Sequence, residues 1–251
     1  MSAPIPFTLH GADGKRIHGD RVQGTGRQVL FITGFLSKRW GNKSKALLHW
    51  CQEQGWGFCC YDVRGCGESE GSFTDYTLSD WVADARTVLA MLTSGPPLTI
   101  VGNSLGSWIA WLIARDCPLV QQLILIAPAF NMMGERARAI PKERLHAWHT
   151  AGWMPWDDDP LHRDWPLSWK WVEESEAYWE STFDGVRRVR TTILHGLQDT
   201  VIDPDGSRRF ADELQRRDPT FPLDLRLVPG DHRLSDPAQV ETLRRLVVEG
   251  W

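Results

Sequence analysis

The sequence predicts an α/β protein built on a mostly parallel β-sheet with helices on both faces. Short apolar runs alternate along the chain with segments of helical spacing. The central runs are apolar at every position instead of every second one, which is typical of strands buried on both faces. The 251 residues, 42% hydrophobic and 24% charged, have the size and composition of one large α/β domain.

The strands are predicted from these runs. Phe7–His10 and Arg16–Gln23 flank the turn-rich string GADGK at 11–15 and should form an antiparallel pair. Buried parallel strands are then expected at Val29–Ile32, Gly57–Tyr61, Leu98–Val101, Gln122–Ile126, Thr191–Leu194 and Leu223–Leu227.

Helices are expected between these strands. Lys43–Gln54 carries its apolar residues on one side, and Ser79–Asp80 can cap a helix that runs to about Leu92. Further helices are expected at about Ser104–Arg115, Ser207–Arg217 and Pro237–Val248.

One segment, from Asn131 to about Phe183, breaks the alternation between the fourth and fifth parallel strands. A stretch that long inside a compact domain is usually functional or an inserted subdomain. We therefore expect one domain over residues 1–251, with a cap inserted at about 131–183 that covers the ends of the strands. Half of the chain's 14 tryptophans lie in this segment and offer apolar walls: Trp148, Trp153, Trp156, Trp165, Trp169, Trp171 and Trp179.

The strongest functional signal is the string GNSLG at residues 102–106, between an apolar strand and an apolar helix. That context is typical of a nucleophile elbow, a sharp strand-to-helix turn that exposes a serine. Glycine is needed at Gly102 and Gly106 because a side chain there would collide with the neighbouring strand and helix. Ser104 is therefore the predicted nucleophile, beside the free N–H groups of the helix start.

A serine hydroxyl needs a base, and an elbow of this kind is followed in the chain first by the acid and then by a histidine. Of eight histidines, only His195 and His232 lie near the ends of late strands. His232, in the loop between the last strand and the last helix, is the predicted base. His195 directly ends the fifth strand, where a hydrogen-bonded structural histidine is favoured over a functional one.

The acid must orient the imidazole. Asp231 adjoins His232, and adjacent side chains rarely meet head on. Asp199 and Asp203 both follow the fifth strand, but Asp203 precedes a proline and reads as the approach to the next helix. Asp199 is therefore favoured, with Asp203 as the alternative.

An oxyanion requires two converging N–H donors. The residue after the nucleophile, Leu105, should supply one. The other should come from the loop after the Val29–Ile32 strand, where Gly34 lets the chain bend close and the N–H of Phe35 is the choice.

Other polar clusters are given structural roles. Asp62 and Arg64 should fix the loop after the second parallel strand through salt bridges. The residues His146, His149, Asp157, Asp158, Asp159 and His162 match no tight ligand pattern. No metal and no cofactor are predicted.

Charge and cysteine usage exclude several classes. With a net charge of −4 and basic residues mixed among acidic ones, no nucleic-acid partner is expected. No stretch is long and apolar enough to cross a bilayer. The start, MSAPIPFTLH, lacks the features of a targeting segment, and the five cysteines read as free thiols, so we expect a cytoplasmic protein.

The strings TGFLS, YDVRGCGES, GNSLGS, HGLQD and GDHR, in this order, resemble α/β-hydrolase-fold serine esterases. More narrowly, GFLSKRWGNKSKAL, YDVRGCGESEG and GDHRLSD resemble the palmitoyl-protein thioesterase and acyl-glucuronide esterase family with its bacterial relatives. The match runs from about Gly34 to His232 but is poor across 131–183. The family often has a second glycine after the elbow, where this chain has Ser107. The resemblance implies the α/β-hydrolase fold, with Ser104, Asp199 and His232 as triad and acyl esters or thioesters as substrates.

These observations together predict a serine hydrolase of carboxylic esters, with thioesters as the nearest alternative. Carbon–carbon bond hydrolysis by the same residues is a further alternative. A non-catalytic receptor is disfavoured because nucleophile, acid and base types are all present in order.

Overall fold

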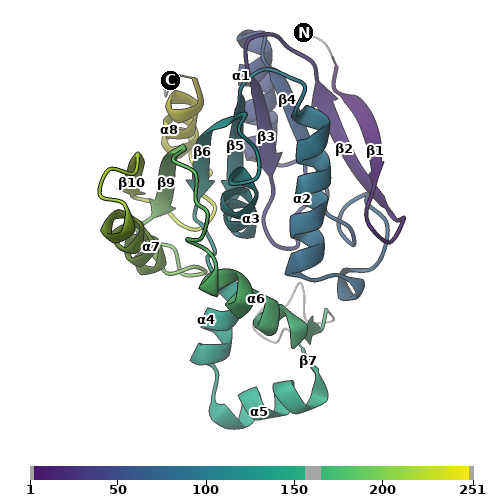
Figure 1. Ribbon diagram of the computed structural model, residues 1–251, viewed down its shortest axis with the longest axis vertical. Helices are drawn as coiled ribbons and strands as arrows, with labels where there is room; N and C mark the ends of the chain where they lie inside the picture. The colour runs from purple at the N-terminus through teal and green to yellow at the C-terminus, as the bar shows by residue number, and fades with distance from the viewer. Residues whose placement is uncertain (1–2, 156–164, 249–251) are drawn as a thin grey trace.

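The computed structural model describes residues 3–155 and 165–248. In this part of the chain, eight strands form one sheet in the order β1-β2-β4-β3-β5-β6-β9-β10 (Figure 1). The edge strand β1 pairs antiparallel with β2, and β2 pairs antiparallel with β4. All other neighbours in this sheet are parallel, as the continuously apolar runs predicted.

Each predicted strand is present, most of them extended by one to three residues. The extension arises because backbone pairing continues past the apolar run: Gly102 and Asn103 still pair with β6. The strands are β1 (Ile5–His10), β2 (Arg16–Val22), β3 (Gln28–Ile32), β4 (Gly57–Tyr61), β5 (Leu98–Asn103), β6 (Val120–Ile126), β9 (Arg190–Gly196) and β10 (Leu223–Val228).

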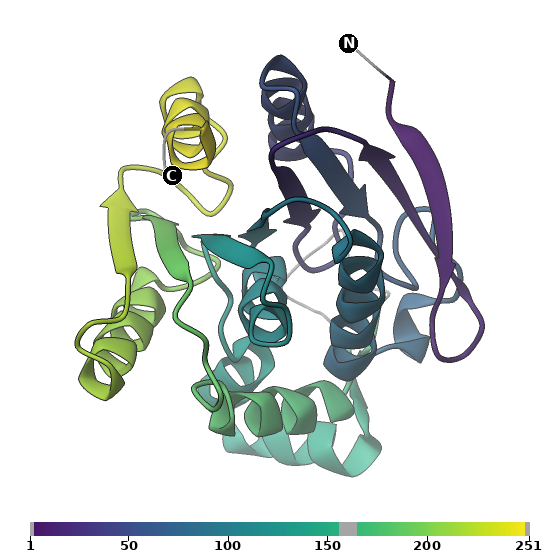
Figure 2. The same ribbon diagram turned by 45° about the horizontal axis from the view of Figure 1, so that its top comes forward.

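Helices cover both faces of the sheet and enclose one apolar core on each (Figure 2). On one face lie α1 (Asn42–Glu53) and α8 (Pro237–Val248). The other face carries α2 (Leu78–Leu92), α3 (Leu105–Ala114) and α7 (Pro204–Arg217). Alternate residues of one strand serve the two cores, so Leu30 packs with the α2 side and Val29 with the α1 side.

The sequence prediction placed the N-cap of α2 two residues too late. The helix begins at Leu78, after the short 3-10 helix η1 (Phe73–Asp75), and its N-cap is Thr77 instead of Ser79. The backbone N–H of Thr77 donates to Asp80 Oδ2 at 2.9 Å, which is the Thr-x-x-acid form of a capping box.

The segment 131–183 leaves the end of β6, and its described residues lie beyond the carboxyl ends of the parallel strands (Figure 1). It holds three helices, α4 (Met132–Ala139), α5 (Lys142–Ala151) and α6 (Lys170–Glu180), and the small antiparallel pair β7 (Trp153–Met154) and β8 (Leu167–Ser168) among the described residues. Trp156 and the residues Asp157, Asp158, Asp159 and His162 lie outside the described part of the chain. We call 131–183 the cap segment.

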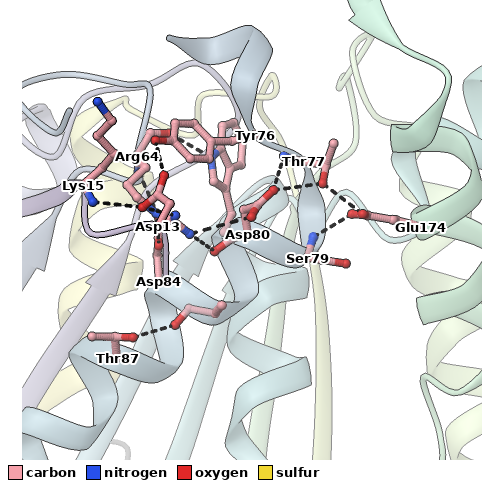
Figure 3. A network of polar contacts seen from close by, with 12 residues as sticks. Asp13, Lys15, Arg64, Tyr76, Thr77, Ser79, Asp80, Asp84, Thr87 and Glu174 are labelled. Atoms are coloured by element: carbon pink, nitrogen blue, oxygen red, sulfur yellow. Dashed lines mark hydrogen bonds and ion pairs between the residues drawn. The ribbon is translucent and has the colours of Figure 1, made fainter. Parts of the chain in front are cut away.

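A carboxylate of the cap segment holds the start of α2. Glu174 accepts hydrogen bonds from the Ser79 N–H at 2.7 Å and from Thr77 Oγ1 at 2.9 Å (Figure 3). A negative charge is favourable at a helix N-terminus, where backbone N–H groups lack partners within the helix. Nearby, the buried ring of Trp171 on α6 packs edge-on against Trp81 of α2, with 5.0 Å between the centroids.

The loop after β4 is fixed by ion pairs, as predicted. Arg64 Nε donates to the buried Asp84 of α2 at 2.6 Å, and its guanidinium also binds Asp13 at 2.8 Å (Figure 3). Asp62 accepts the N–H of Arg39 at 2.6 Å and also binds the Arg39 guanidinium. The loop is therefore tied to α2, to the β1–β2 turn and to the segment after β3.

The five cysteines are free thiols, as predicted, and all five are buried. Burial raises the pKa of the Cys51 thiol to about 12, so this thiol is unreactive near neutral pH. Within residues 3–155 and 165–248, the helices are too short or too polar to span a bilayer.

The Glu174 contact predicts a specific stability effect. Glu174→Ala removes the acceptor of the first turn of α2 and should lower the free energy of unfolding by about 1 kcal/mol, the usual cost of a lost N-terminal cap. Urea unfolding followed by tryptophan fluorescence measures it. Glu173→Ala, at an exposed position in the first turn of α6, is the matched control and should cost clearly less, because Glu173 lies on a different helix start and binds no group of α2. Equal effects of the two substitutions would contradict the capping role.

Candidate active site

Ser104 occupies a strained turn between β5 and α3. Its backbone lies at φ 55° and ψ −122°, a region that costs a non-glycine residue on the order of 1–3 kcal/mol. Two bonds to the segment that ends β6 hold it there: the Ser104 N–H donates to the Ile126 carbonyl at 2.8 Å, and its carbonyl accepts the Ala129 N–H at 3.2 Å. The hydroxyl is thus presented at the carboxyl edge of the sheet.

The flanking glycines are required by close packing, as predicted. A Cβ on Gly102 would lie 2.4 Å from Ser107 Cα, and one on Gly106 would lie 2.3 Å from the Ile32 carbonyl oxygen. Ser107, which stands where the resemblance implied a glycine, is fully buried and donates its hydroxyl to the Ile126 carbonyl at 3.0 Å. The serine therefore ties α3 to β6 without opening the turn.

Three side chains predicted from the sequence meet in one hydrogen-bonded line. Ser104 Oγ lies 3.2 Å from His232 Nε2, and His232 Nδ1 lies 2.7 Å from Asp199 Oδ2. They come from three loops, those after β5, β10 and β9. Ser104 and Asp199 are both buried, whereas the His232 side chain between them is 19% exposed, so the histidine is the member of the line most open to solvent.

The surroundings of Asp199 keep it ionised. Burial alone would raise the pKa of Asp199, but hydrogen bonds from His195, from His232 and from the Ile202 N–H hold this pKa well below its usual range. Its second oxygen, Oδ1, accepts the N–H groups of Val201 and Ile202, both at 2.8 Å. The carboxylate is thus fixed in orientation and carries its charge at neutral pH.

The two other candidate acids bind backbone groups instead. Asp203 is the N-cap of α7, and its Oδ1 accepts the Asp205 N–H at 3.0 Å. Asp231 Oδ1 accepts the N–H groups of Arg233 and Leu234 at 2.9 and 3.1 Å, which shapes the turn that carries His232.

Two residues beside this line make contacts that were not predicted from the sequence. His195 is fully buried and hydrogen-bonded, as favoured, but one of its partners is Asp199 itself, 3.0 Å from Nε2. Lys43 of α1 donates its ammonium group to the Arg233 carbonyl, beside His232. Burial lowers the pKa of Lys43 to about 8. The Lys43 contact joins segments 190 residues apart, whereas the His195–Asp199 contact depends on the geometry of the turn after β9, for which the spacing of the two residues offered only a weak signal.

The loop after β3 passes close to Ser104. A Cβ on Gly34 would lie 3.1 Å from Ser104 Cβ, so the backbone of Gly34 and Phe35 runs beside the hydroxyl-bearing turn. The Ser37 N–H closes a turn on the Gly34 carbonyl at 3.2 Å, with Leu36 at φ 55°. On the other side, Leu105 opens α3 and contributes the first N–H of the helix, which has no partner within the helix.

The ring of Phe35 joins this loop to the cap segment. It lies 5.3 Å from Trp171 and 5.4 Å from Phe73 by ring centroids, edge-on in both cases. Trp165, which is 38% exposed, stacks on the other partner, Phe73, at 5.4 Å. The aromatic contacts of the cap segment therefore reach the backbone beside Ser104.

Most of the described cap tryptophans serve packing. Trp148 is buried and donates its indole N–H to the Leu167 carbonyl at 2.9 Å, while Trp169 packs edge-on against it. Trp179 packs near Phe130 and Phe183. Among the described residues, no group of three or more His, Cys, Asp or Glu side chains is placed to hold a metal ion.

Known proteins share the fold of this chain. The family described as serine aminopeptidase, S33, matches residues 27–158. The mitochondrial palmitoyl-protein thioesterase ABHD10 of Mus musculus is 28% identical over 230 residues, which cover 89% of this chain and 74% of that protein. The solved structure of alpha/beta hydrolase domain-containing protein 10 from mouse superposes with a TM-score of 0.82 at 24% identity, covering 98% of this chain and 97% of that one. Est1E from Butyrivibrio proteoclasticus, solved with ferulic acid bound, superposes with a TM-score of 0.78 at 20% identity, covering 97% of both chains.

The line of side chains can move the Ser104 proton to an imidazole and leave a nucleophilic oxygen. The reactivity of Ser104 should therefore depend on Asp199 and not on Asp203. We expect Asp199→Asn to slow covalent labelling of Ser104 by a fluorophosphonate on the order of 10²- to 10⁴-fold, because the amide favours the wrong histidine tautomer. Asp203→Asn, which keeps a good N-cap, should label within about threefold of the parent. The reverse order would make Asp203 the acid.

Proposed function

This chain belongs to the serine aminopeptidase S33 family of hydrolases and has the α/β-hydrolase fold. We propose that it cleaves carboxylic esters through an acyl-enzyme on Ser104. The observation that carries the proposal is the hydrogen-bonded line from Ser104 through His232 to Asp199 on a strained elbow. Support comes from the relative named as a thioesterase and from the fold shared with Est1E.

In the proposed acylation, Ser104 Oγ attacks the ester carbonyl while its proton passes to His232 Nε2, 3.2 Å away. The tetrahedral intermediate collapses when the carbon–oxygen bond to the alcohol breaks and the imidazolium returns the proton to the leaving oxygen. Asp199 holds His232 Nδ1–H at 2.7 Å and stabilises the imidazolium with its negative charge.

The oxyanion of this intermediate is assigned to two backbone N–H groups, those of Leu105 and Phe35. The first stands at the positive end of α3, and the second follows Gly34, the residue whose missing side chain allows the loop to approach Ser104. Both donors are backbone groups, so the fold fixes them before substrate arrives.

Deacylation reverses the roles. Water replaces the alcohol, His232 takes a proton from it, and the hydroxide attacks the acyl carbonyl. The bond to Ser104 Oγ then breaks, and the imidazolium returns the proton to Oγ. The products are a carboxylic acid and the free enzyme, and no cofactor takes part in the proposed cycle.

Acyl thioesters are the second candidate substrates, favoured by the name of the relative that shares 28% identity. A thiolate leaves more readily than an alkoxide, so the same residues suffice for both reactions. A panel of oxygen esters, thioesters and acyl glucuronides, each with the same acyl group, separates the two by kcat/KM.

The proposal predicts the outcome of removing the nucleophile. Ser104→Ala should lower kcat for p-nitrophenyl esters on the order of 10⁴- to 10⁶-fold with the fold retained. Ser94→Ala, at an exposed position after α2, is the control and should keep kcat within about threefold. Near-parent turnover by Ser104→Ala would overturn the assignment, and absence of turnover by the parent on the whole panel would favour a receptor.

The cap segment is proposed to select the acyl group. Trp165→Ala removes an exposed ring that stacks on Phe73 beside the Phe35 loop. The ratio of kcat/KM between short and long acyl chains should change by an amount equivalent to about 1–3 kcal/mol. Trp153, 44% exposed on β7, is the matched control. An ester ladder from acetyl to long-chain acyl groups measures the effect. An unchanged ladder for Trp165→Ala, or equal shifts for both variants, would show that this ring does not select the substrate.

A further inference from the structure

One carboxylate oxygen in this site serves two histidines. Asp199 Oδ2 lies 2.7 Å from His232 Nδ1 and 3.0 Å from His195 Nε2, while Oδ1 is occupied by two backbone N–H groups. His232 is partly exposed and is the proposed base. His195 is fully buried at the end of β9 and has no part in the proton transfers of the proposed reaction.

The hydrogen bonds of His195 define where its proton lies. Nε2 faces two acceptors, Asp199 Oδ2 and the Ile202 carbonyl oxygen at 3.1 Å, so this nitrogen must carry a proton. Nδ1 lies 2.7 Å from Ser207 Oγ, and Ser207 is also fully buried. In the neutral ring, the Ser207 hydroxyl donates to Nδ1 and Nε2–H donates to Asp199.

We propose that His195 is a positioning residue, held by Ser207 of α7, whose Nε2–H fixes Asp199 Oδ2 in line with His232 Nδ1. The inference rests on the proposed function. It gives two residues of the HGLQD string, His195 and Asp199, which stand four residues apart, separate roles as positioning residue and acid. Val201 and Ile202 bind Oδ1, and His195 restrains the rotation that would swing Oδ2 away from His232. The low pKa of Asp199, to which the hydrogen bond from His195 contributes, accords with this arrangement.

The arrangement matters because the acid acts through orientation. A carboxylate that turns about its Cβ–Cγ bond presents a poorer acceptor to the His232 N–H, and the histidine then populates the wrong tautomer or rotamer. Loss of the His195 contact should therefore appear in kcat, at the step where His232 takes the proton, and leave substrate binding unchanged.

Two amide substitutions separate positioning from packing. The amide nitrogen of glutamine reaches the place of histidine Nε2, whereas that of asparagine reaches only the place of Nδ1. His195→Asn should lower kcat on the order of 10- to 100-fold with KM within twofold, the size of effect that outer hydrogen-bond partners have at metal sites. His195→Gln should restore kcat to within about threefold of the parent. His49→Asn, at an exposed position on α1, controls for loss of a histidine.

Ser207→Ala keeps the experiment decisive if His195→Asn does not fold. This change removes one buried oxygen and leaves Nδ1 without its donor, so kcat should fall about 3- to 10-fold at unchanged KM. The inference would be overturned by unaltered kcat in His195→Asn, or by equal losses of kcat in the asparagine and glutamine variants. If only Ser207→Ala folds, unaltered kcat in that variant would overturn it. Failure of the proposed function is distinguishable, because the parent enzyme would then show no esterase activity that depends on Ser104.

Discussion

The close approach of α3 to the ends of β3 and β5 is the constraint on which the site depends. Only glycine fits at 102 and 106, where an added Cβ would lie within about 2.4 Å of backbone atoms. This packing forces Ser104 to a positive φ and directs its hydroxyl out of the turn. Because the sheet is parallel here, the strands β3, β6, β9 and β10 all end at the same edge. The loop that follows each of them therefore begins near that hydroxyl and contributes residues around it.

Around this turn, the side chains beside Ser104 are held by hydrogen bonds to other protein atoms. Asp199 receives hydrogen bonds from two histidines and two backbone N–H groups, and Asp231 and Lys43 fix the turn that carries His232. The cap segment is tied to the same region by Glu174 on the start of α2 and by Trp171 on Phe35. A change in the cap segment can therefore reach the backbone beside Ser104 through a single ring.

The features predicted well from the sequence are those that arise within a short stretch. A continuously apolar run predicts a buried strand, and GNSLG predicts its elbow because the glycine collisions involve the adjoining strand and helix. The position of His232 followed from chain order. The contacts of His195, Lys43 and Glu174 could not be predicted, because each depends on segments that are distant in the sequence or on the exact geometry of a turn. The start of α2 was misplaced for a local reason: Thr77 and Asp80 form the capping box, so Ser79 lies in the first turn, where Glu174, 95 residues away, binds its N–H.

The central claim, that Ser104 carries the acyl group during turnover, is tested most directly by trapping the intermediate. The enzyme is mixed with a p-nitrophenyl ester, quenched in acid within the first turnover, digested with trypsin and analysed by mass spectrometry. The account predicts one acyl group on the peptide spanning residues 87–115, localised to Ser104 by fragmentation, and its loss when the reaction runs to completion. Burst release of p-nitrophenol with the acyl group on another residue, or steady turnover with no acylated peptide at any quench time, would contradict it.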